Sequence, residues 1–244
     1  MPVQIKGFIE NSLIEWEGMI SSIIFLSGCN FRCSYCHSPS LVNSTEDMET
    51  IPLEAVTSYL KKNRAWVDGV VISGGEPTLH SGLKELLKKL KALGLKVKLD
   101  TNGTNPASLE ELIGDRLLDC IAMDVKAPLE DKNYQEAAGR PCNVQDLKHS
   151  IKLIIESGLE HEFRTTVCPS FLGKEEIEDI AHTLQGAKRY VLQPFRPKNC
   201  LESSMSKVTP YPLEKLRHFR EIARAHVADC YIRGEAEPIN SQNR

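Results

Sequence analysis

Short apolar segments rich in β-branched residues alternate with segments of helical periodicity along most of this 244-residue chain. Strands that alternate with helices in this way are typical of a parallel sheet covered by helices. Right-handed crossovers curl such a sheet toward a barrel, and six units leave the barrel open on one side. We therefore expect an α/β fold, a partial (β/α)6 barrel, with strands at 20–26, 69–72, 96–99, 120–123, 162–167 and 190–192.

The helices between these strands are predicted from leucine and isoleucine residues spaced three and four apart. The clearest face comprises Leu83, Leu86, Leu87, Leu90 and Leu93. Similar faces occur over 147–155 and 177–184, and prolines that favour a first helical turn precede predicted helices at 53–63, 107–113 and 213–227. We expect a single domain over 1–244, with its core at about 18–195, a C-terminal helix and tail at 210–244, and fraying of the last eight residues.

The composition indicates which partners and which cellular location to expect. A formal net charge of -3 argues against a nucleic-acid surface held by bulk charge. The sequence has no apolar run long enough to span a membrane, and its start lacks the apolar core of a signal peptide, so we expect no membrane association and a cytoplasmic location. The 8 Cys are then expected to be metal ligands or buried thiols and to form no disulfides.

Cys29, Cys33 and Cys36 form a compact C-x3-C-x2-C motif just after the first predicted strand. A cubane iron-sulfur cluster takes four ligands, so three thiolates leave one iron open to a substrate or cofactor. Two other hypotheses are a zinc site that adds His37 and a redox dithiol of Cys33 and Cys36. The zinc site is strained because His37 directly follows Cys36, and the dithiol leaves Cys29 unexplained.

Unusual residues also follow the other predicted strands. In a βα barrel the C-terminal ends of the strands converge on one face, where active sites are built. We therefore expect one pocket to gather the cysteine loop, Ser73-Gly74-Gly75-Glu76-Pro77, Asp100-Thr101-Asn102-Gly103, Asp124-Val125-Lys126, Arg164 and Gln193.

The cysteine spacing, with Tyr35 before the third cysteine, resembles the signature of the radical S-adenosylmethionine (radical SAM) superfamily. Gly74-Gly75-Glu76-Pro77 resembles the element of that family that contacts the methionine amino group. Over about 5–195 the chain is similar to activating enzymes of glycyl radical proteins, most of all those of anaerobic ribonucleoside-triphosphate reductase and more distantly those of pyruvate formate-lyase. The stretches that carry this likeness are 7–13, 25–33, 99–103 and 123–128.

The resemblance implies that Cys29, Cys33 and Cys36 hold a 4Fe-4S cluster whose open iron chelates S-adenosylmethionine (SAM). Reductive cleavage of SAM would give a 5'-deoxyadenosyl radical that removes a hydrogen atom from a glycine of a partner, such as anaerobic ribonucleotide reductase. The electron donor would be a flavodoxin or ferredoxin. The implied cofactor-binding residues are Tyr35, Gly74, Gly75, Glu76, Asp124, Lys126 and Arg164.

Two features depart from the activating enzymes. Ser38 stands where they commonly have Asn, and no further Cys lies between Cys36 and Gly74, so additional ferredoxin-like clusters are not expected there. A radical SAM enzyme acting on a small molecule or nucleotide, such as a deazaguanine synthase, is the alternative within the same chemistry. His37 is a candidate for a hydrogen bond at the site, beside a purely structural role.

Overall fold

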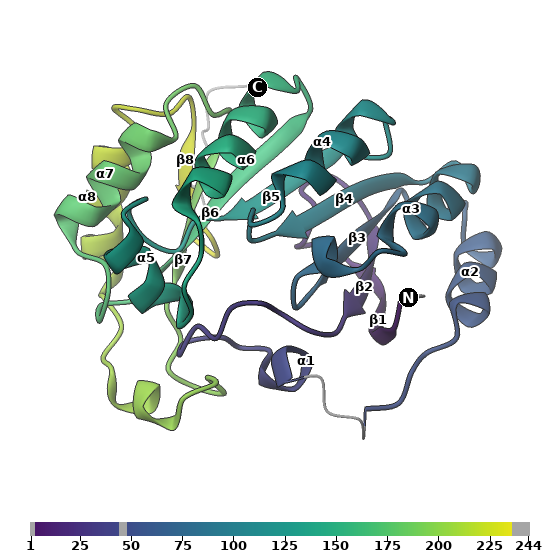
Figure 1. Cartoon of the computed structure of the whole chain (residues 1–244), viewed down its shortest axis with the longest axis horizontal. Helices are drawn as coiled ribbons and strands as arrows, with labels where there is room; N and C mark the ends of the chain where they lie inside the picture. Colours follow the sequence, from purple (N-terminus) through teal and green to yellow (C-terminus); the bar gives the residue numbers. More distant parts are fainter. Residues whose placement is uncertain (1–2, 44–47, 236–244) are drawn as a thin grey trace, which may run out of the picture.

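One sheet organises the computed structural model, which describes residues 3–43 and 48–235. Within these residues eight strands pair in chain order, β1 to β8 (Figure 1). Only β1 is antiparallel to its neighbour, and β1 does not pair with β8, so the sheet curves without closing. The strands are β1 (Ile5–Ser12), β2 (Ser21–Leu26), β3 (Gly69–Gly74), β4 (Lys96–Thr101), β5 (Cys120–Asp124), β6 (Glu160–Val167), β7 (Tyr190–Pro194) and β8 (Cys230–Ile232).

The six predicted strands correspond to β2 through β7, which confirms the α/β fold and the open parallel barrel. The two strands at the edges of the sheet were not predicted, and both lie outside the expected 18–195 core. In β1 no residue after Ile5 is buried, and β8 has only 3 residues. Such segments show neither the continuous apolar run nor the alternation that predicts a strand.

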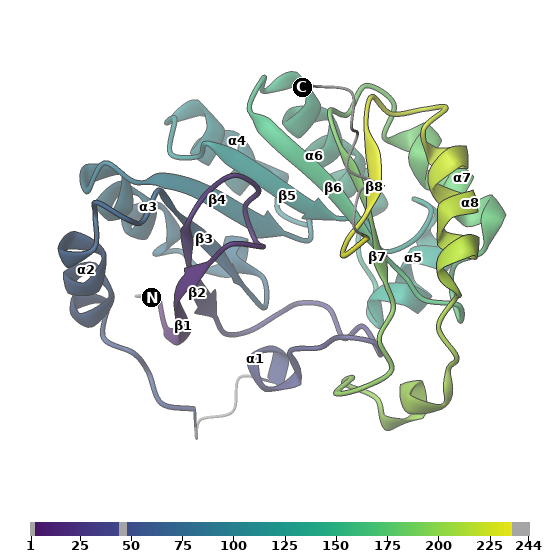
Figure 2. The ribbon, with the colours of Figure 1, turned by 180° about the vertical axis from the view of Figure 1, so that it is seen from behind.

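Helices cover the outer face of the sheet in both views (Figures 1 and 2). The predicted helices are present, although the last ends at Ala223 and not at 227, while α1 and α5 were not predicted. The expected fraying of the last eight residues concerns positions outside the described ranges. The helices are α1 (Pro39–Asn43), α2 (Leu53–Lys62), α3 (Leu83–Ala92), α4 (Pro106–Gly114), α5 (Asp131–Ala138), α6 (Val144–Glu156), α7 (Lys174–Thr183) and α8 (Leu213–Ala223), with 3-10 turns η1 (Pro77–Leu79) and η2 (Ser203–Lys207).

The alternation of side chains along β4 shows how the strands divide the molecule. Val97 and Leu99 are fully buried in the core between sheet and helices, while Lys98 and Asp100 point to the inside of the barrel. The barrel interior is therefore polar in its middle, and the apolar core lies outside the sheet.

The loop between β1 and β2 covers the end of the barrel where the parallel strands begin. Trp16 is 4% exposed and packs with Ile23, Val71 and Cys120 against the starts of the strands. A Cβ at Gly69 would overlap the Trp16 ring, so the glycine makes room for it. With this end filled, an open pocket can form only toward the other end. Within the described ranges, no helix is long and apolar enough to cross a membrane.

Candidate active site

A cavity lies where the parallel strands end. The cysteine loop forms one wall, and residues from the ends of β3 to β6 form the other. Sequence segments separated by more than a hundred residues thus meet around one space, as the strand order predicted. The lining residues are Cys29, Phe31, Cys33, Tyr35, Cys36, His37, Ser38, Val42, Ser73, Gly74, Gly75, Asp100, Thr101, Asn102, Asp124, Lys126, Arg164 and Thr166.

Backbone hydrogen bonds from three directions hold the cysteine loop. The N–H of Gly28 donates to Leu41 at 2.7 Å, that of Arg32 donates to Ala138 at 2.7 Å, and that of Leu201 donates to Cys36 at 2.9 Å. The approach to α5 depends on Gly139, which has a φ of 67° and whose Cβ would overlap the carbonyl oxygen of Arg32. These bonds tie the loop to α1, to α5 and to the segment after β7.

Within the loop, the Arg32 guanidinium folds back on its own backbone. Its Nη1 donates to the carbonyl oxygens of Cys29 at 2.6 Å and Phe31 at 2.7 Å. These bonds close the turn between the first two cysteines and keep a positive charge beside it. Burial raises the pKa of the Cys33 thiol to about 11 and also raises the pKa of Cys29, so metal binding at neutral pH must displace protons.

The His37 side chain contacts backbone outside the cysteine loop. Its Nε2 lies 2.8 Å from the carbonyl oxygen of Arg196, so this nitrogen is already engaged by backbone. In residues 3–43 and 48–235 no three His, Cys, Asp or Glu side chains are gathered around a single metal-ion position. All eight cysteines are free thiols. The contact of His37 with Arg196 gives no support to a zinc site that uses this histidine.

Gly74 and Gly75 allow the end of β3 to touch the cysteine loop. A Cβ at Gly75 would overlap the carbonyl oxygen of Gly28, and Gly74 has a φ of 124° against the backbone of Leu26. This close approach allows the N–H of Gly75 to donate a hydrogen bond to the carbonyl oxygen of Leu26 at 2.9 Å. Both glycines line the cavity with backbone alone, which leaves peptide groups accessible to a ligand.

Glu76 lies behind the cavity wall and does not line it. Its Oε1 accepts hydrogen bonds from Thr78 N at 3.0 Å, Thr78 Oγ1 at 2.6 Å and Thr101 Oγ1 at 2.8 Å. Its Oε2 accepts from Asn102 N at 2.6 Å. Burial raises the pKa of Glu76 above its ordinary value, although the hydrogen bonds from these donors act to lower it. The side chain expected to bind a cofactor therefore joins the strand ends, and only its neighbours face the pocket.

Asp124, Lys126 and Arg164 meet at the cavity. Asp124 Oδ2 accepts from Lys126 Nζ at 3.0 Å, and its Oδ1 accepts from Arg164 Nε at 2.8 Å. Burial alone would raise the pKa of Asp124, but Arg164 and Lys126 hold it well below its ordinary value. Burial opposes the charge of Lys126, and Asp124 raises its pKa despite that. All three residues are thus ionised and mutually oriented.

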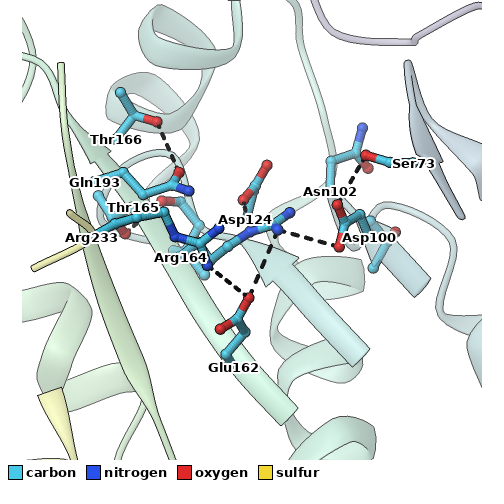
Figure 3. Close-up of polar contacts among 12 residues, drawn as sticks. Ser73, Asp100, Asn102, Asp124, Glu162, Arg164, Thr165, Thr166, Gln193 and Arg233 are labelled. Atoms are coloured by element: carbon cyan, nitrogen blue, oxygen red, sulfur yellow. Dashed lines mark hydrogen bonds and ion pairs between the residues drawn. The ribbon is translucent and has the colours of Figure 1, made fainter. Parts of the chain in front are cut away.

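Arg164 also contacts the neighbouring strands (Figure 3). Its Nη1 lies 3.2 Å from Asp100 Oδ1 and 3.8 Å from Glu162 Oε1, and Ser73 donates to the other Asp100 oxygen at 2.9 Å. The direct cross-strand pairing of Asp124 with Arg164 explains why these side chains share one face of the sheet. One guanidinium therefore joins three carboxylates from β4, β5 and β6.

Sequence reasoning did not single out Glu162, Lys98 or Thr166. A signal was present: Glu162, Arg164 and Thr166 stand at alternate positions of one strand, so they share a face, and two are charged in an otherwise buried sheet. Gln193, expected at the pocket, is the residue before the last of β7 and pairs with Thr166, whose Oγ1 lies 3.4 Å from Gln193 Oε1. Gln193 is not among the cavity-lining residues.

Tyr35 supplies an unsatisfied polar atom. Its ring packs on Phe171 with centroids 5.7 Å apart, the residue is 4% exposed, and its hydroxyl is buried without a hydrogen-bond partner. Burial raises the pKa of this phenol well above its ordinary value, so it stays protonated. A buried hydroxyl at a cavity wall suits a pocket that receives a polar ligand.

Comparison with known proteins identifies the chemistry. The family model described as "Radical SAM superfamily" matches residues 23–207. The chain belongs to the radical SAM superfamily. The protein therefore uses a 4Fe-4S cluster and SAM. The residues present fit these groups: three thiols from one rigid loop face the glycine backbone of β3 across the cavity, with the Tyr35 hydroxyl unsatisfied between loop and core.

Among curated relatives, the chain is 34% identical over 239 residues to a Methanocaldococcus jannaschii protein named "Putative glycyl-radical enzyme activating enzyme", covering 96% of this chain and 97% of the relative. It is 27% identical to the pyruvate formate-lyase-activating enzyme of Clostridium pasteurianum, over 72% of this chain and 74% of that one. It is 28% identical to the 7-carboxy-7-deazaguanine synthase of Clostridium acetobutylicum, over 67% and 80% of the two chains.

Solved structures support the fold. The crystal structure of Streptococcus suis SuiB bound to S-adenosylmethionine matches with a TM-score of 0.65 at 20% identity, over 86% of this chain and 52% of that chain. The superfamily and its cofactors are thus established for this radical SAM protein, and its relatives include glycyl-radical activating enzymes.

Proposed function

We propose that this protein generates a glycyl radical on a partner enzyme, with anaerobic ribonucleoside-triphosphate reductase as the expected partner. The observation that carries the proposal is the end-to-end similarity to a relative named for glycyl-radical activation, over 96% of this chain. The named pyruvate formate-lyase activator among the relatives adds to it. The likeness to activators of the reductase, seen in stretches such as 99–103 and 123–128, supports the choice of partner.

In this proposal Cys29, Cys33 and Cys36 hold the cluster, and the backbone of Gly74 and Gly75 receives the amino group of SAM. When bound, the reduced cluster would supply the one electron needed to cleave SAM to methionine and a 5'-deoxyadenosyl radical. That radical would take the α-hydrogen of the partner's glycine, giving 5'-deoxyadenosine and leaving the unpaired electron on the glycine.

The cationic side chains of the pocket suit the carboxylate of SAM. Lys126 and Arg164 both line the cavity, and each is fixed by Asp124. Charge-assisted hydrogen bonds from cations held in a set orientation are strong. We therefore assign carboxylate binding to these cations. Asp124 orients them, Tyr35 donates from the wall, and Glu76 supports the glycine segment from behind.

The proposal includes a flavodoxin or ferredoxin as electron donor and a cytoplasmic location. The electron donor is proposed because reduction of the cluster needs a strong reductant. The location is proposed because free cysteine thiols are typical of a reducing compartment. Nucleic acid has no part in it, consistent with the formal net charge of -3.

The test traces the transfer of the glycine α-hydrogen from the partner to 5'-deoxyadenosine. The reduced enzyme is incubated without oxygen with SAM and the anaerobic reductase of its own source organism, prepared with α-deuterated glycine. We expect 5'-deoxyadenosine that carries one deuterium, seen by mass spectrometry, and none with Cys33→Ala. A partner with its radical-site glycine changed to alanine is the matched control. Undeuterated product at the same rate with both partners would refute glycine as the hydrogen source.

A second candidate is a radical SAM reaction on a small molecule or nucleotide, favoured by the similarity to 7-carboxy-7-deazaguanine synthases. It predicts the formation of 7-carboxy-7-deazaguanine, with no glycyl radical on any protein. Chromatography of the small-molecule fraction distinguishes the two.

A further inference from the structure

A group of ionised side chains is buried inside the barrel below the cavity, away from the cysteine loop. Lys98 Nζ lies 2.9 Å from Glu162 Oε1, and these side chains are 3% and 7% exposed. Arg233, just after β8, places Nη2 3.2 Å from the same oxygen. The Tyr231 hydroxyl lies 3.4 Å from Glu162 Oε2. One carboxylate is thus contacted from β4 and from the C-terminal edge of the sheet.

Glu162 also reaches the cavity-lining Arg164. The two residues are two apart on β6 and share the inner face, so Glu162 lies one step deeper in the barrel. Figure 3 shows Glu162 on one side of the guanidinium and Asp100 on another. Arg164 Nη1 lies between them, 3.8 Å from Glu162 and 3.2 Å from Asp100.

Burying such a network does not by itself stabilise a protein. Removing charges from water costs several kcal/mol per ion, and apolar replacements of buried ion pairs are often neutral or stabilising. The network does, however, affect the orientation of the Arg164 guanidinium. Arg164 Nε donates a hydrogen bond to Asp124, while the carboxylates of Asp100 and Glu162 lie within ion-pair distance of Nη1, so rotation of the guanidinium would move it away from two negative charges.

Glu162 remains charged in this setting. Burial alone would raise its pKa, but Lys98, Arg164 and Arg233 hold the pKa below its ordinary value. Lys98 is in turn fixed by the carbonyl oxygen of Glu15 at 2.7 Å, in the loop that closes the barrel. The network therefore links that loop and the last strand to Arg164.

We propose that Glu162 is a positioning residue for Arg164, and that Lys98 and Arg233 hold Glu162 in place so that the guanidinium meets the carboxylate of SAM in a fixed orientation. This rests on the role in SAM binding assigned above to Arg164. It makes β8 and Arg233 parts of the active-site support, although neither lines the cavity.

The test measures SAM affinity and thermal stability separately. The cluster-loaded, reduced protein is titrated with SAM, and the change in its electron paramagnetic resonance (EPR) spectrum gives the dissociation constant. Glu162→Gln should raise this constant about tenfold, as expected when a charged partner of a ligand-binding group is lost. Iron content should stay at about four per chain.

A double variant separates positioning from folding. Glu162→Gln leaves Lys98 unpaired and lowers the melting temperature, so Glu162→Gln with Lys98→Met should recover much of that loss and still bind SAM about tenfold more weakly. The matched control is Glu235→Gln. Glu235 is held at 2.7 Å by both Arg217 and Arg220, away from the cavity, so its loss should lower the melting temperature and leave the SAM affinity unchanged.

Wild-type SAM affinity in the double variant would overturn the proposal. Affinity that falls with melting temperature in every variant, Glu235→Gln included, would overturn it as well. Arg164→Lys tests the premise, because it keeps the charge and loses the fork; unchanged affinity there would remove the role of Arg164 and the proposal with it. None of these readings depends on glycyl radical formation, so that proposal stands or fails separately.

Discussion

The Glu76 carboxylate accepts a hydrogen bond from the backbone N–H of Asn102 at 2.6 Å, which ties the segment after β3 to the segment after β4. Both Asn102 and the glycines before Glu76 line the cavity. The carboxylate thus fixes two walls of the pocket from behind.

Replacing Glu76 by glutamine should disturb this junction. Both carboxylate oxygens accept hydrogen bonds, so either orientation of the amide turns its NH2 group toward a donor. We expect the free energy of unfolding of the metal-free protein to fall by about 1–3 kcal/mol in denaturant titrations. Glu110→Gln, at an exposed position of α4, is the control. Equal stability of the two variants would contradict the structural role.

Gly75→Ala should prevent cluster assembly. The added Cβ overlaps the carbonyl oxygen of Gly28, which is backbone and next to Cys29, so the cysteine loop must move. Iron analysis after reconstitution should give much less than the about four irons expected for the wild type. Gly114→Ala, where a Cβ meets nothing within 4 Å, should load iron normally. Full loading of both variants would show that the contact does not position the loop.

Each of the three loop cysteines should be required for the cluster, and the others should not. Cys33→Ala is expected to abolish the visible absorption of the reconstituted protein, because two thiolates cannot replace three. Cys142→Ala, which changes another partly buried free thiol, should keep it. A spectrum retained in Cys33→Ala would refute the ligand assignment.

Acid should weaken the buried ion network. The pKa of Asp124 lies below its ordinary value in the folded protein, because Arg164 and Lys126 outweigh the effect of burial. Its stabilising contribution is therefore complete above the unfolded-state pKa, about 3.9, and decreases as the pH falls through the lower folded value. Unfolding of the metal-free protein between pH 7 and 2 should show this loss.

Asp124→Asn should flatten that acid limb and lower the stability at neutral pH. Asp179→Asn, at an exposed position of α7, should reproduce the wild-type profile. An unchanged slope in Asp124→Asn would mean that this carboxylate is not the group that titrates.

Local patterns were enough to predict the six inner strands and the cysteine loop, because buried parallel strands are continuous apolar runs and the three cysteines lie within eight residues of one another. The gathering of the strand-end residues around one pocket could also be predicted, because the C-terminal ends of parallel strands meet on one face of the barrel. The edge strands β1 and β8 could not be predicted, because what makes them strands is pairing with β2 and β7.

The orientation of individual side chains was also beyond local patterns. Glu76 was expected to bind a cofactor, yet its side chain turns behind the wall, where Thr101 and Asn102 supply donors from the next strand. The pair of Lys98 and Glu162 joins residues 64 positions apart, and its contact depends on the registers of β4, β5 and β6. Charges at alternate positions of a buried strand are the signal that would have drawn attention to it.

The most direct test of the account is EPR spectroscopy of the reduced, reconstituted protein incubated with SAM and the anaerobic ribonucleotide reductase of its own source organism. Generation of a glycyl radical predicts a doublet from the α-hydrogen coupling that grows with time and is absent when Cys29→Ala replaces the wild type. A cluster spectrum that changes on addition of SAM, with no glycyl signal on the reductase, would contradict the proposed partner and reaction.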